Sequence, residues 1–192
     1  DAKNLKQSLM LTAALADLGL PMVLALNMSD EASVRGLRCD IRRLSELLAV
    51  PVVETVATAG EGIEQLRASL VRAAPSRGPR CPAEIEAALE GLRQSVPPGR
   101  WSRCLALGAL CGDRSAAEFL GTGAAEAAEA ARRPFAQPPE LLVHTAREAW
   151  ALDILSQVQT QAQPGRPGWL QFLDLWTMRG LPGYALVAAT LL

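Results

Sequence analysis

The sequence predicts an α/β fold, a doubly wound parallel sheet, in the first part of the chain and an all-α region after it. Two short apolar runs, 21–30 and 50–56, each end in polar residues, and each is followed by a helical pattern. Apolar runs of this length are typical of parallel strands that are covered on both faces. The order strand, helix, strand, helix is that of a doubly wound sheet.

The first run, PMVLALNMSD, brings Asn27 and Asp30 to the carboxyl end of its strand, where ligands bind in open α/β sheets. A carboxylate can accept hydrogen bonds from the ring N–H and the amino group of guanine, and an Asn amide can serve its O6 and N7 edge. Adenine presents an acceptor where this carboxylate needs a donor, which costs about 1–3 kcal/mol. The pair therefore favours GTP over ATP.

The same two residue types also have a structural interpretation, because Asn and Asp after a strand commonly cap helices or form turns. The second run, VPVVETV, ends in a turn of small residues, 57–60, at the same edge of the sheet. Small residues there allow backbone N–H groups to approach the guanine O6 closely. Two such turns at one edge favour a base site.

Three helices complete the first part of the prediction. A helix over 4–18 closes at Gly19, a second runs from its cap Asp40 to Leu48, and a third covers 63–73. Their inward residues are expected to be Leu5, Leu9, Ala13 and Ala16 in the first, Leu44, Leu47 and Leu48 in the second, and Ile63, Leu66 and Leu70 in the third.

Composition limits the classes of function. The 192 residues include 19 basic and 20 acidic side chains, a net charge of −1, so nothing in the overall charge indicates a nucleic-acid partner. The four cysteines match no metal knuckle and no CxxC pair, which predicts free thiols in a reducing compartment: Cys39, Cys81, Cys104 and Cys111. The single histidine, His144, is expected to be structural, and we predict no metal ligands and no catalytic residue in this chain.

The second part of the chain is expected to be helical. After a linker over 75–82, helices are predicted at 83–96, 101–111, 124–132 and 140–161. The last helix is expected to turn an apolar stripe inward: Leu141, Leu142, Ala146, Ala149 and Leu152. The acidic residues Glu84, Glu86 and Glu90 are interpreted as a solvated helix face.

The end of the chain suggests a membrane. A linker over 163–168 precedes an aromatic amphipathic stretch, 169–176, of the kind found at membrane interfaces. The apolar run at the end of the chain is about half of the roughly 20 residues that span a bilayer. The expected divisions are 1–74, a linker 75–82, 83–162, a linker and interfacial segment 163–180, and the start of a transmembrane helix at 181–192. Because the chain opens on Asp1, we expect it to be a piece of a longer chain.

Three stretches of the chain have a common resemblance: Asp1-Ala2 with Asn4-Leu5, then LTAALADLGLPMVLALNMSDEA, then LSELLAVPVVETVATAGEGIEQL. They resemble one family, the bacterial ferrous iron transport protein B, or FeoB, family. The guanine motif of that family carries Met where most GTPases carry Lys, and Asn27, Met28, Ser29 and Asp30 reproduce it. Ala57-Thr58 stands at the fifth GTPase motif, although the family usually has Ser at the position of Ala57.

The resemblance implies the distal half of a P-loop GTPase-like G domain, a helical domain that relays nucleotide state, and the start of the first transmembrane helix. Its guanine nucleotide, GTP or GDP, would contact Asn27, Met28, Asp30, Ala57 and Thr58. Mg²⁺ is expected only with an upstream half, because no GxxxxGKS or GxxxxGKT sequence occurs in the chain.

The resemblance also implies the wider role of the protein. The full-length protein would be a GTPase of the bacterial inner membrane that couples GTP binding and hydrolysis to Fe²⁺ uptake. This region would be cytoplasmic up to about residue 180, and a homo-oligomer is conceivable in that family. We identify no iron ligands in these residues.

Met28 itself supports a prediction. A Lys here would lay its alkyl stem along the base and tie the loop to the phosphate loop through its ammonium group, whereas Met supplies only the apolar stem. We therefore expect modest nucleotide affinity and fast exchange.

Two other classes of function remain open from the sequence. One is a soluble GTPase of the translation or ribosome-assembly type with a helical appendage, against which the near-neutral charge argues. The other is a non-enzymatic helical interaction module over 83–161, with Asn27 and Asp30 as mere caps.

Overall fold

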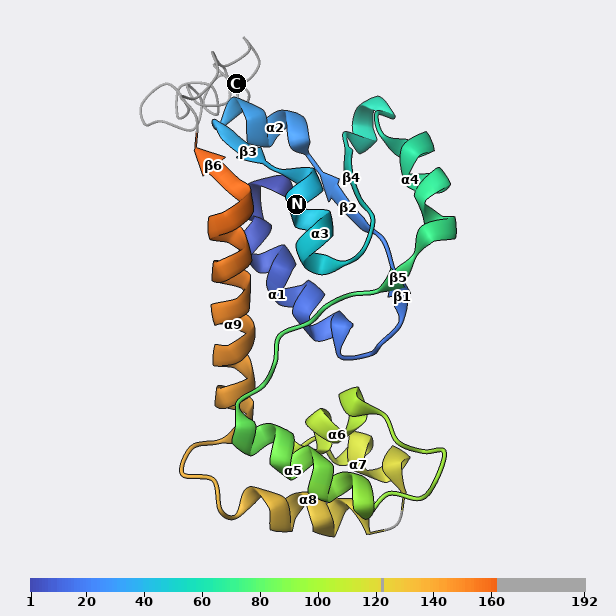
Figure 1. Ribbon diagram of the computed structural model, residues 1–192, viewed down its shortest axis with the longest axis vertical. Helices are drawn as coiled ribbons and strands as arrows, with labels where there is room; N and C mark the ends of the chain where they lie inside the picture. The colour runs from blue at the N-terminus through green and yellow to red at the C-terminus, as the bar shows by residue number, and fades with distance from the viewer. Residues whose placement is uncertain (122, 162–192) are drawn as a thin grey trace, which may run out of the picture.

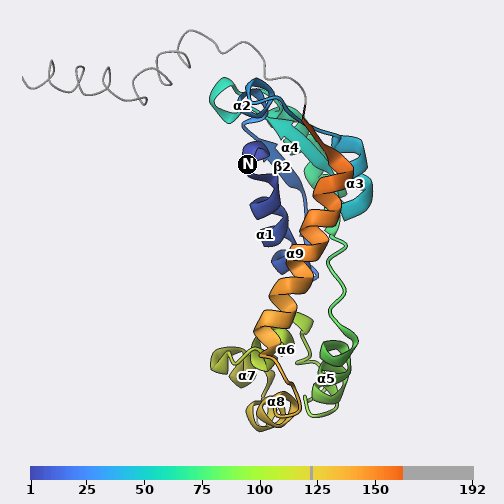
Figure 2. The same cartoon turned by 90° about the vertical axis from the view of Figure 1, so that its left-hand side faces the viewer.

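The computed structural model describes residues 1–121 and 123–161, which form two lobes joined by one long helix, α9 (Pro139–Val158) (Figure 1). The first lobe is an α/β structure, and the second is a cluster of short helices at the far end of α9. The view turned by 90° shows the same separation along the axis of α9 (Figure 2).

The first lobe is built around two parallel strands, β2 (Leu24–Asn27) and β4 (Val52–Thr55), with Asn27 opposite Thr55. Two antiparallel pairs extend this arrangement: β1 (Pro21–Met22) with β5 (Ala74–Pro75), and β3 (Leu37–Cys39) with β6 (Gln159–Gln161). The helical elements around them are η1 (Ala2–Asn4), α1 (Leu5–Ala16), α2 (Ser29–Val34), α3 (Ile41–Leu48), η2 (Ala57–Ala59), α4 (Ile63–Ser69) and η3 (Leu70–Arg72).

The predicted strand over 21–30 forms but is covered less than expected. It is divided between β1 and β2, and only Leu26 of β2 is buried, while Ala25 is exposed. The prediction of cover on both faces is therefore wrong for the described residues, because none of their elements covers the face that Ala25 presents.

Capping residues lie close to the helix ends that the sequence predicts, although α1 ends at Ala16 and not at residue 18. The N–H of Gly19 donates to the Ala16 carbonyl at 3.0 Å, and Gly19 has a φ of +67° that suits its lack of a side chain. Asp40 accepts a hydrogen bond from the N–H of Arg43 at 2.9 Å and so begins α3. The inward phase of the third helix is wrong at Leu70, which is 59% exposed because α4 ends at Ser69.

The core of the first lobe includes residues from both ends of the chain. Its buried members are Ala2, Leu5, Leu9, Leu26, Ala32, Leu44, Leu48, Val50, Ala151, Ile154 and Val158. The last three belong to α9, which packs against α1 and α3. The second half of α9 is therefore part of the first lobe.

The predicted stripe on α9 is wrong. Leu141, Ala149 and Leu152 are exposed, and Leu142 and Ala146 are only half-buried, whereas Val143, Ala151, Ile154 and Val158 are buried. The helix contacts different partners along its length, so its buried face follows those partners rather than the leucines. His144 is exposed on this helix.

Three strands, β3, β5 and β6, were not predicted. The helix expected over 140–161 ends at Val158, and Gln159–Gln161 pairs with Leu37–Cys39 instead. The N–H of Asp40 donates to the carbonyl of Val158 at 2.8 Å, which continues this pairing.

The second lobe consists of α5 (Ala83–Gln94), α6 (Arg103–Leu110), α7 (Arg114–Leu120) and α8 (Ala124–Arg132). Three of these were predicted, and α7 was not, although Asp113 caps it by accepting from the N–H groups of Ser115 and Ala116. Its core holds Ile85, Leu89, Leu92, Ala106, Leu107, Leu110, Leu120 and Val143, among others. The division of the chain into 1–74, 75–82 and 83–162 stays a prediction.

The four cysteines are free thiols, as predicted. Burial raises the pKa of each of them, that of Cys39 to about 11, so none has the lowered pKa of a reactive thiol.

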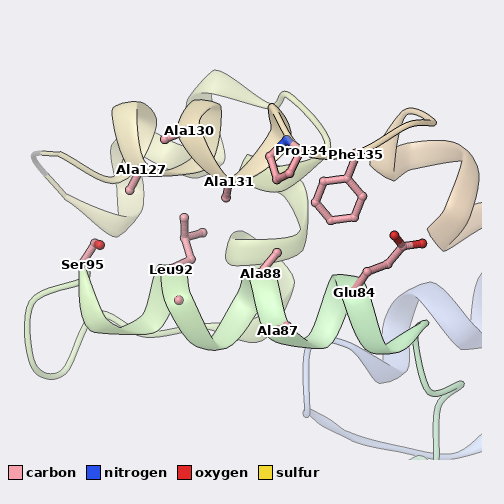
Figure 3. A pocket seen from close by; sticks show the side chains of 11 residues that line it. Glu84, Ala87, Ala88, Leu92, Ser95, Ala127, Ala130, Ala131, Pro134 and Phe135 are labelled. Atoms are coloured by element: carbon pink, nitrogen blue, oxygen red, sulfur yellow. The ribbon is translucent and has the colours of Figure 1, made fainter.

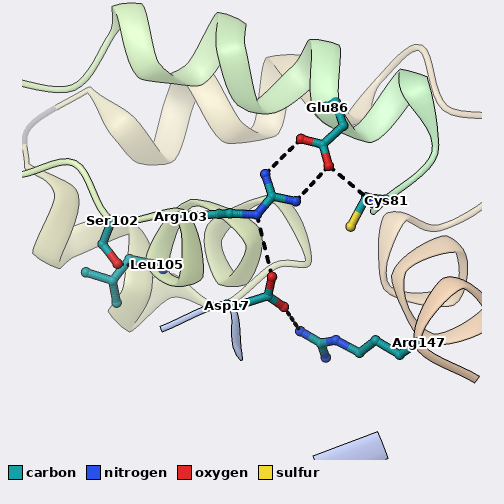
Figure 4. A network of polar contacts seen from close by, with 7 residues as sticks. All are labelled: Asp17, Cys81, Glu86, Ser102, Arg103, Leu105 and Arg147. Atoms are coloured by element: carbon teal, nitrogen blue, oxygen red, sulfur yellow. Dashed lines mark hydrogen bonds and ion pairs between the residues drawn. The ribbon is translucent and has the colours of Figure 1, made fainter. Parts of the chain in front are cut away.

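A network of charged side chains joins the two lobes at the end of α1 (Figure 4). The carboxylate of Asp17, which is 5% exposed, lies 2.8 Å from Nη2 of Arg147 on α9 and 3.5 Å from Nε of Arg103 on α6. Arg103 also donates two hydrogen bonds to Glu86 on α5, at 2.7 and 2.8 Å. The network therefore holds together one helix of the first lobe, two of the second and the helix that connects them.

The position of Asp17 explains why it needs two arginines. A carboxylate at the C-terminal end of a helix faces the negative end of the helix dipole and gains nothing from it. Burial adds a desolvation cost that only nearby cations offset. The pKa of Glu86 is lowered, mainly because Arg103 hydrogen-bonds to its carboxylate, so this pair is charged at neutral pH.

The predicted linker and interfacial segment at 163–180 and the predicted start of a transmembrane helix at 181–192 lie outside the described residues. Among residues 1–121 and 123–161, no helix combines the length and the apolar character that a bilayer span requires.

Replacing Asp17 with Asn should lower the free energy of unfolding by about 1.5–3 kcal/mol, because two arginines lose a charged acceptor. Urea denaturation followed by circular dichroism measures this. The matched control is Glu118→Gln on the exposed face of α7, which should change stability by less than about 0.5 kcal/mol. Equal effects of the two changes would contradict the role given to Asp17.

Candidate functional site

Asn27 links the ends of the two parallel strands through its side chain. Its Oδ1 accepts hydrogen bonds from the N–H of Ala57 at 3.1 Å and from Oγ1 of Thr55 at 3.2 Å. Thr55 is buried, and its hydrogen bond to Asn27 is partly buried. Both hydrogen bonds go to the oxygen, and the Nδ2 amino group donates no hydrogen bond within residues 1–121 and 123–161.

Met28 makes the sharp turn from β2 into α2. Its backbone has φ 61° and ψ 38°, a left-handed conformation that residues other than glycine rarely adopt. Its side chain is 38% exposed. The Oγ of Ser29 lies 3.5 Å from the Thr55 carbonyl and connects the same two strand ends again. Strained backbone of this kind clusters at functional sites.

Asp30 lies in the first turn of α2 and is exposed. Its carboxylate forms no hydrogen bond or ion pair within the part of the chain that the structure describes, whereas the neighbouring Glu31 pairs with Lys3 at 2.6 Å. The N-cap of α2 is Met28, and no side chain caps this helix. The interpretation of Asn27 and Asp30 as helix caps is therefore wrong.

The turn after β4 is closed by its own backbone. Val56 and Glu61 exchange hydrogen bonds of 3.1 and 3.2 Å, and the turn between them forms η2. Ala57 and Thr58 are exposed on this turn. The N–H of Ala57 is held by Asn27, and those of Ala59 and Gly60 donate to Val56 and Ala57.

Because of these bonds, the turn can offer fewer N–H groups to a base than the sequence predicts. Among the N–H groups of residues 57–60, only that of Thr58 has no acceptor within residues 1–121 and 123–161. Ala57 presents a methyl group where a Ser would carry a hydroxyl. The turn can therefore offer one N–H and two small exposed side chains to a ligand.

Gly62 fixes the turn against β4. Its φ is +77°, and a Cβ at this position would lie 2.1 Å from the carbonyl oxygen of Glu54. Only glycine permits this close approach of two backbone segments. The turn is therefore held at both ends, by Asn27 at its start and by Gly62 after it.

Within the described part of the chain, Asn27 and Asp30 belong to no metal-binding group of side chains, and they do not line the cavity nearby. No group of three His, Cys, Asp or Glu side chains with metal-binding geometry occurs within the described ranges. A cavity of about 330 Å³ between β2, β3 and β6 is lined by Leu26, Ser29, Cys39, Glu54 and Gln159, among others, but not by Asn27 or Asp30.

Known proteins share this arrangement. Residues 1–70, which include both turns, match the family model described as ferrous iron transport protein B. Over residues 1–70 the chain belongs to the FeoB family. The Fe(2+) transporter FeoB of Salmonella typhimurium is 46% identical over 72 residues, which are 38% of this chain and 9% of that protein.

A further FeoB relative matches a longer part of the chain than residues 1–70. A Fe(2+) transport protein A/Fe(2+) transporter FeoB fusion protein of Porphyromonas gingivalis is 34% identical over 134 residues, 63% of this chain and 16% of that protein. The chain therefore spans only a small part of the curated FeoB relatives that it matches.

Solved FeoB structures have the same fold. A GDP-bound variant of NFeoB from S. thermophilus matches with a TM-score of 0.73 and 26% identity, over 82% of this chain and 66% of that chain. The cytosolic domain of L. pneumophila FeoB matches with a TM-score of 0.71 and 26% identity, over 84% and 66%. The α/β part of the chain thus has the GTPase-type fold of these FeoB proteins.

The structure brings the predicted residues Asn27, Met28, Ala57 and Thr58 to neighbouring turns at one edge of the strands, with Asp30 in the first turn of α2. It adds Thr55 and Gly62, which sequence reasoning missed, and it gives a contact to Ser29, which the sequence placed in the motif without a role. A signal existed for Gly62, because a glycine in a turn can mark a close approach of two backbone segments. Thr55 had no signal, because a Thr inside a strand is common.

Replacing Gly62 with Ala should destabilise the first lobe more than replacing Gly60 with Ala. Both positions have positive φ, which costs about 1–2 kcal/mol for Ala, but a Cβ at Gly60 meets no atom within 4 Å. The collision with Glu54 should add about 1–3 kcal/mol for Gly62 alone. Urea denaturation of the two variants measures the difference, and equal losses would contradict the close approach.

Proposed function

We propose that residues 21–62 form the base-recognition half of a guanine-nucleotide site. The observation that supports this most is the pair of hydrogen bonds to Asn27 Oδ1 from Ala57 and Thr55. They leave a fixed amino group as a donor, and the O6 and N7 edge of guanine consists of acceptors. The exposed Asp30 carboxylate, without a partner among the described residues, would accept from the N1–H and the 2-amino group.

The other proposed contacts with the base follow from the exposure and the size of Met28, Ala57 and Thr58. Met28 would place its thioether stem along the base, as an apolar and polarisable surface. The N–H of Thr58 would donate to O6, and the methyl of Ala57 would allow the base to approach. Support also comes from the solved FeoB neighbours, one of which is bound to GDP and another to GDP·AlF4⁻ and K⁺.

At the level of the whole protein, we infer a GTP-dependent Fe²⁺ transporter of the bacterial inner membrane. The support is membership of the FeoB family, whose curated members are named Fe(2+) transporters. Phosphate and Mg²⁺ binding, and therefore hydrolysis, would need a phosphate loop that this sequence does not contain. The matched L. pneumophila structure is of a cytosolic domain, which supports a cytoplasmic position for the 84% of this chain that it covers. The proposed cytoplasmic region extends up to about residue 180.

The alternatives from the sequence are weaker. A soluble translation-type GTPase is disfavoured by the family match, and an interaction module with Asn27 and Asp30 as caps is disfavoured because neither residue caps α2. The proposal of a GTP-dependent Fe²⁺ transporter includes a G-domain part at 1–74 and a helical domain at 83–162. It also includes a homo-oligomer and Fe²⁺ as the transported ion.

Replacing Asp30 with Asn should change the base that the full-length protein selects. Asn offers an amino donor in place of one carboxylate oxygen, so it suits the 2-oxo group of xanthine and not the 2-amino group of guanine. GDP binding should weaken about 10- to 100-fold and XDP binding should strengthen. Fluorescent nucleotide titration measures both, with Glu31→Gln as the control. Unchanged GDP binding would contradict the site.

Replacing Met28 with Lys should tighten guanine-nucleotide binding in the full-length protein, because the ammonium group can tie the loop to the phosphate loop. Stopped-flow measurement of GDP release should show slower dissociation. Met28→Leu keeps an apolar side chain without a charge and serves as the control. Unchanged or weaker binding by the Lys variant would contradict the role of Met28.

A further inference from the structure

The second lobe contains a cavity of about 590 Å³ between α5 and α8, remote from Asn27 and Asp30 (Figure 3). Its size falls within the range of small-molecule sites, about 300–1,000 Å³. Most of its lining side chains are small and apolar, with two larger apolar side chains and few polar groups: Glu84, Ala87, Ala88, Gly91, Leu92, Ser95, Ala127, Ala130, Ala131, Pro134 and Phe135.

Gly91 contributes to this cavity without a structural need for glycine. It lies in the interior of α5, its φ is not in the left-handed region, and a Cβ there would meet no atom within 4 Å. Glycine in a helix interior is destabilising relative to alanine. Gly91 is exposed, and its missing side chain leaves the cavity open along α5 at a cost in helix stability.

The two ends of the cavity differ in chemistry. Figure 3 shows the Glu84 carboxylate and the Phe135 ring at one end and Ser95 at the other end. Glu86 and Glu90 on the same helix pair with Arg103 and Arg93. Glu84 forms no ion pair or hydrogen bond within residues 1–121 and 123–161.

A carboxylate beside an aromatic ring is a combination that attracts an organic cation. The carboxylate supplies an ion pair, and the ring face supplies a cation–π contact. An anion would be repelled by Glu84, and a neutral molecule would gain only from leaving water for the apolar walls. The chemistry at this end therefore distinguishes ligands by charge.

We propose that this cavity binds a small organic monocation, with its ammonium group between Glu84 and Phe135 and its apolar body along Leu92 and the alanines of α5 and α8. The single carboxylate in the lining favours one positive charge over several. The site is independent of the guanine-nucleotide proposal, because it shares no residue with it.

The test uses the full chain and two probes of equal length, octylammonium and 1-octanol, both below the concentration at which they aggregate. Titration followed by ¹H–¹⁵N NMR should show saturable shifts of residues in α5 and α8, with octylammonium binding about tenfold more tightly than octanol. Absence of saturable shifts at these residues would overturn the proposal.

Two variants separate the parts of the site. Glu84→Gln should remove the preference for the amine and leave octanol binding unchanged, while the control Glu90→Gln, outside the cavity lining, should keep the preference. Gly91→Leu should fill the cavity and abolish binding of both probes, with the circular dichroism spectrum unchanged because open space exists there. A preference that survives Glu84→Gln, or binding that survives Gly91→Leu in the folded protein, would overturn it.

Discussion

The arrangement of the two lobes depends on one buried carboxylate, that of Asp17. It lies where α1 ends and the chain turns toward β2, and it is neutralised by arginines that come from α6 and α9. Removing such a charge from water is unfavourable unless cations and hydrogen bonds surround it. The charge of Asp17 is therefore paired when the lobes have the relative position in which Arg103 reaches both Asp17 and Glu86. The strand that carries Asn27 starts only a few residues from this point.

The local elements were largely predictable because their signals lie in neighbouring residues. Gly19 and Asp40 mark helix ends through backbone geometry and capping, and both act as the sequence indicates. The neighbouring position of the turns after β2 and β4 followed from the rule that parallel strands end at one edge. Family membership was predictable for a similar reason, because the motif around Met28 is short and contiguous. The choice of base remains a prediction from the chemistry of Asn27 and Asp30.

What the sequence did not predict depends on contacts between distant residues. The three-residue strand β3 has no pattern of its own and exists because Gln159–Gln161 lies beside it. The buried face of α9 could not be inferred from its leucines, because Val143 contacts one lobe and Ile154 the other. The same limit applies at the candidate site. That the N–H of Ala57 is used by Asn27, and is thus unavailable to a ligand, follows only from the packing of two strands 30 residues apart.

The helix α9 also has a consequence for how the molecule unfolds. Its 20 residues correspond to about 30 Å of continuous helix, and it contributes side chains to both hydrophobic cores. Melting either end removes packing partners from one core and shortens the helix that the other core needs. The lobes, although separate in shape, are therefore expected to lose structure in a single cooperative transition rather than as two independent folding units.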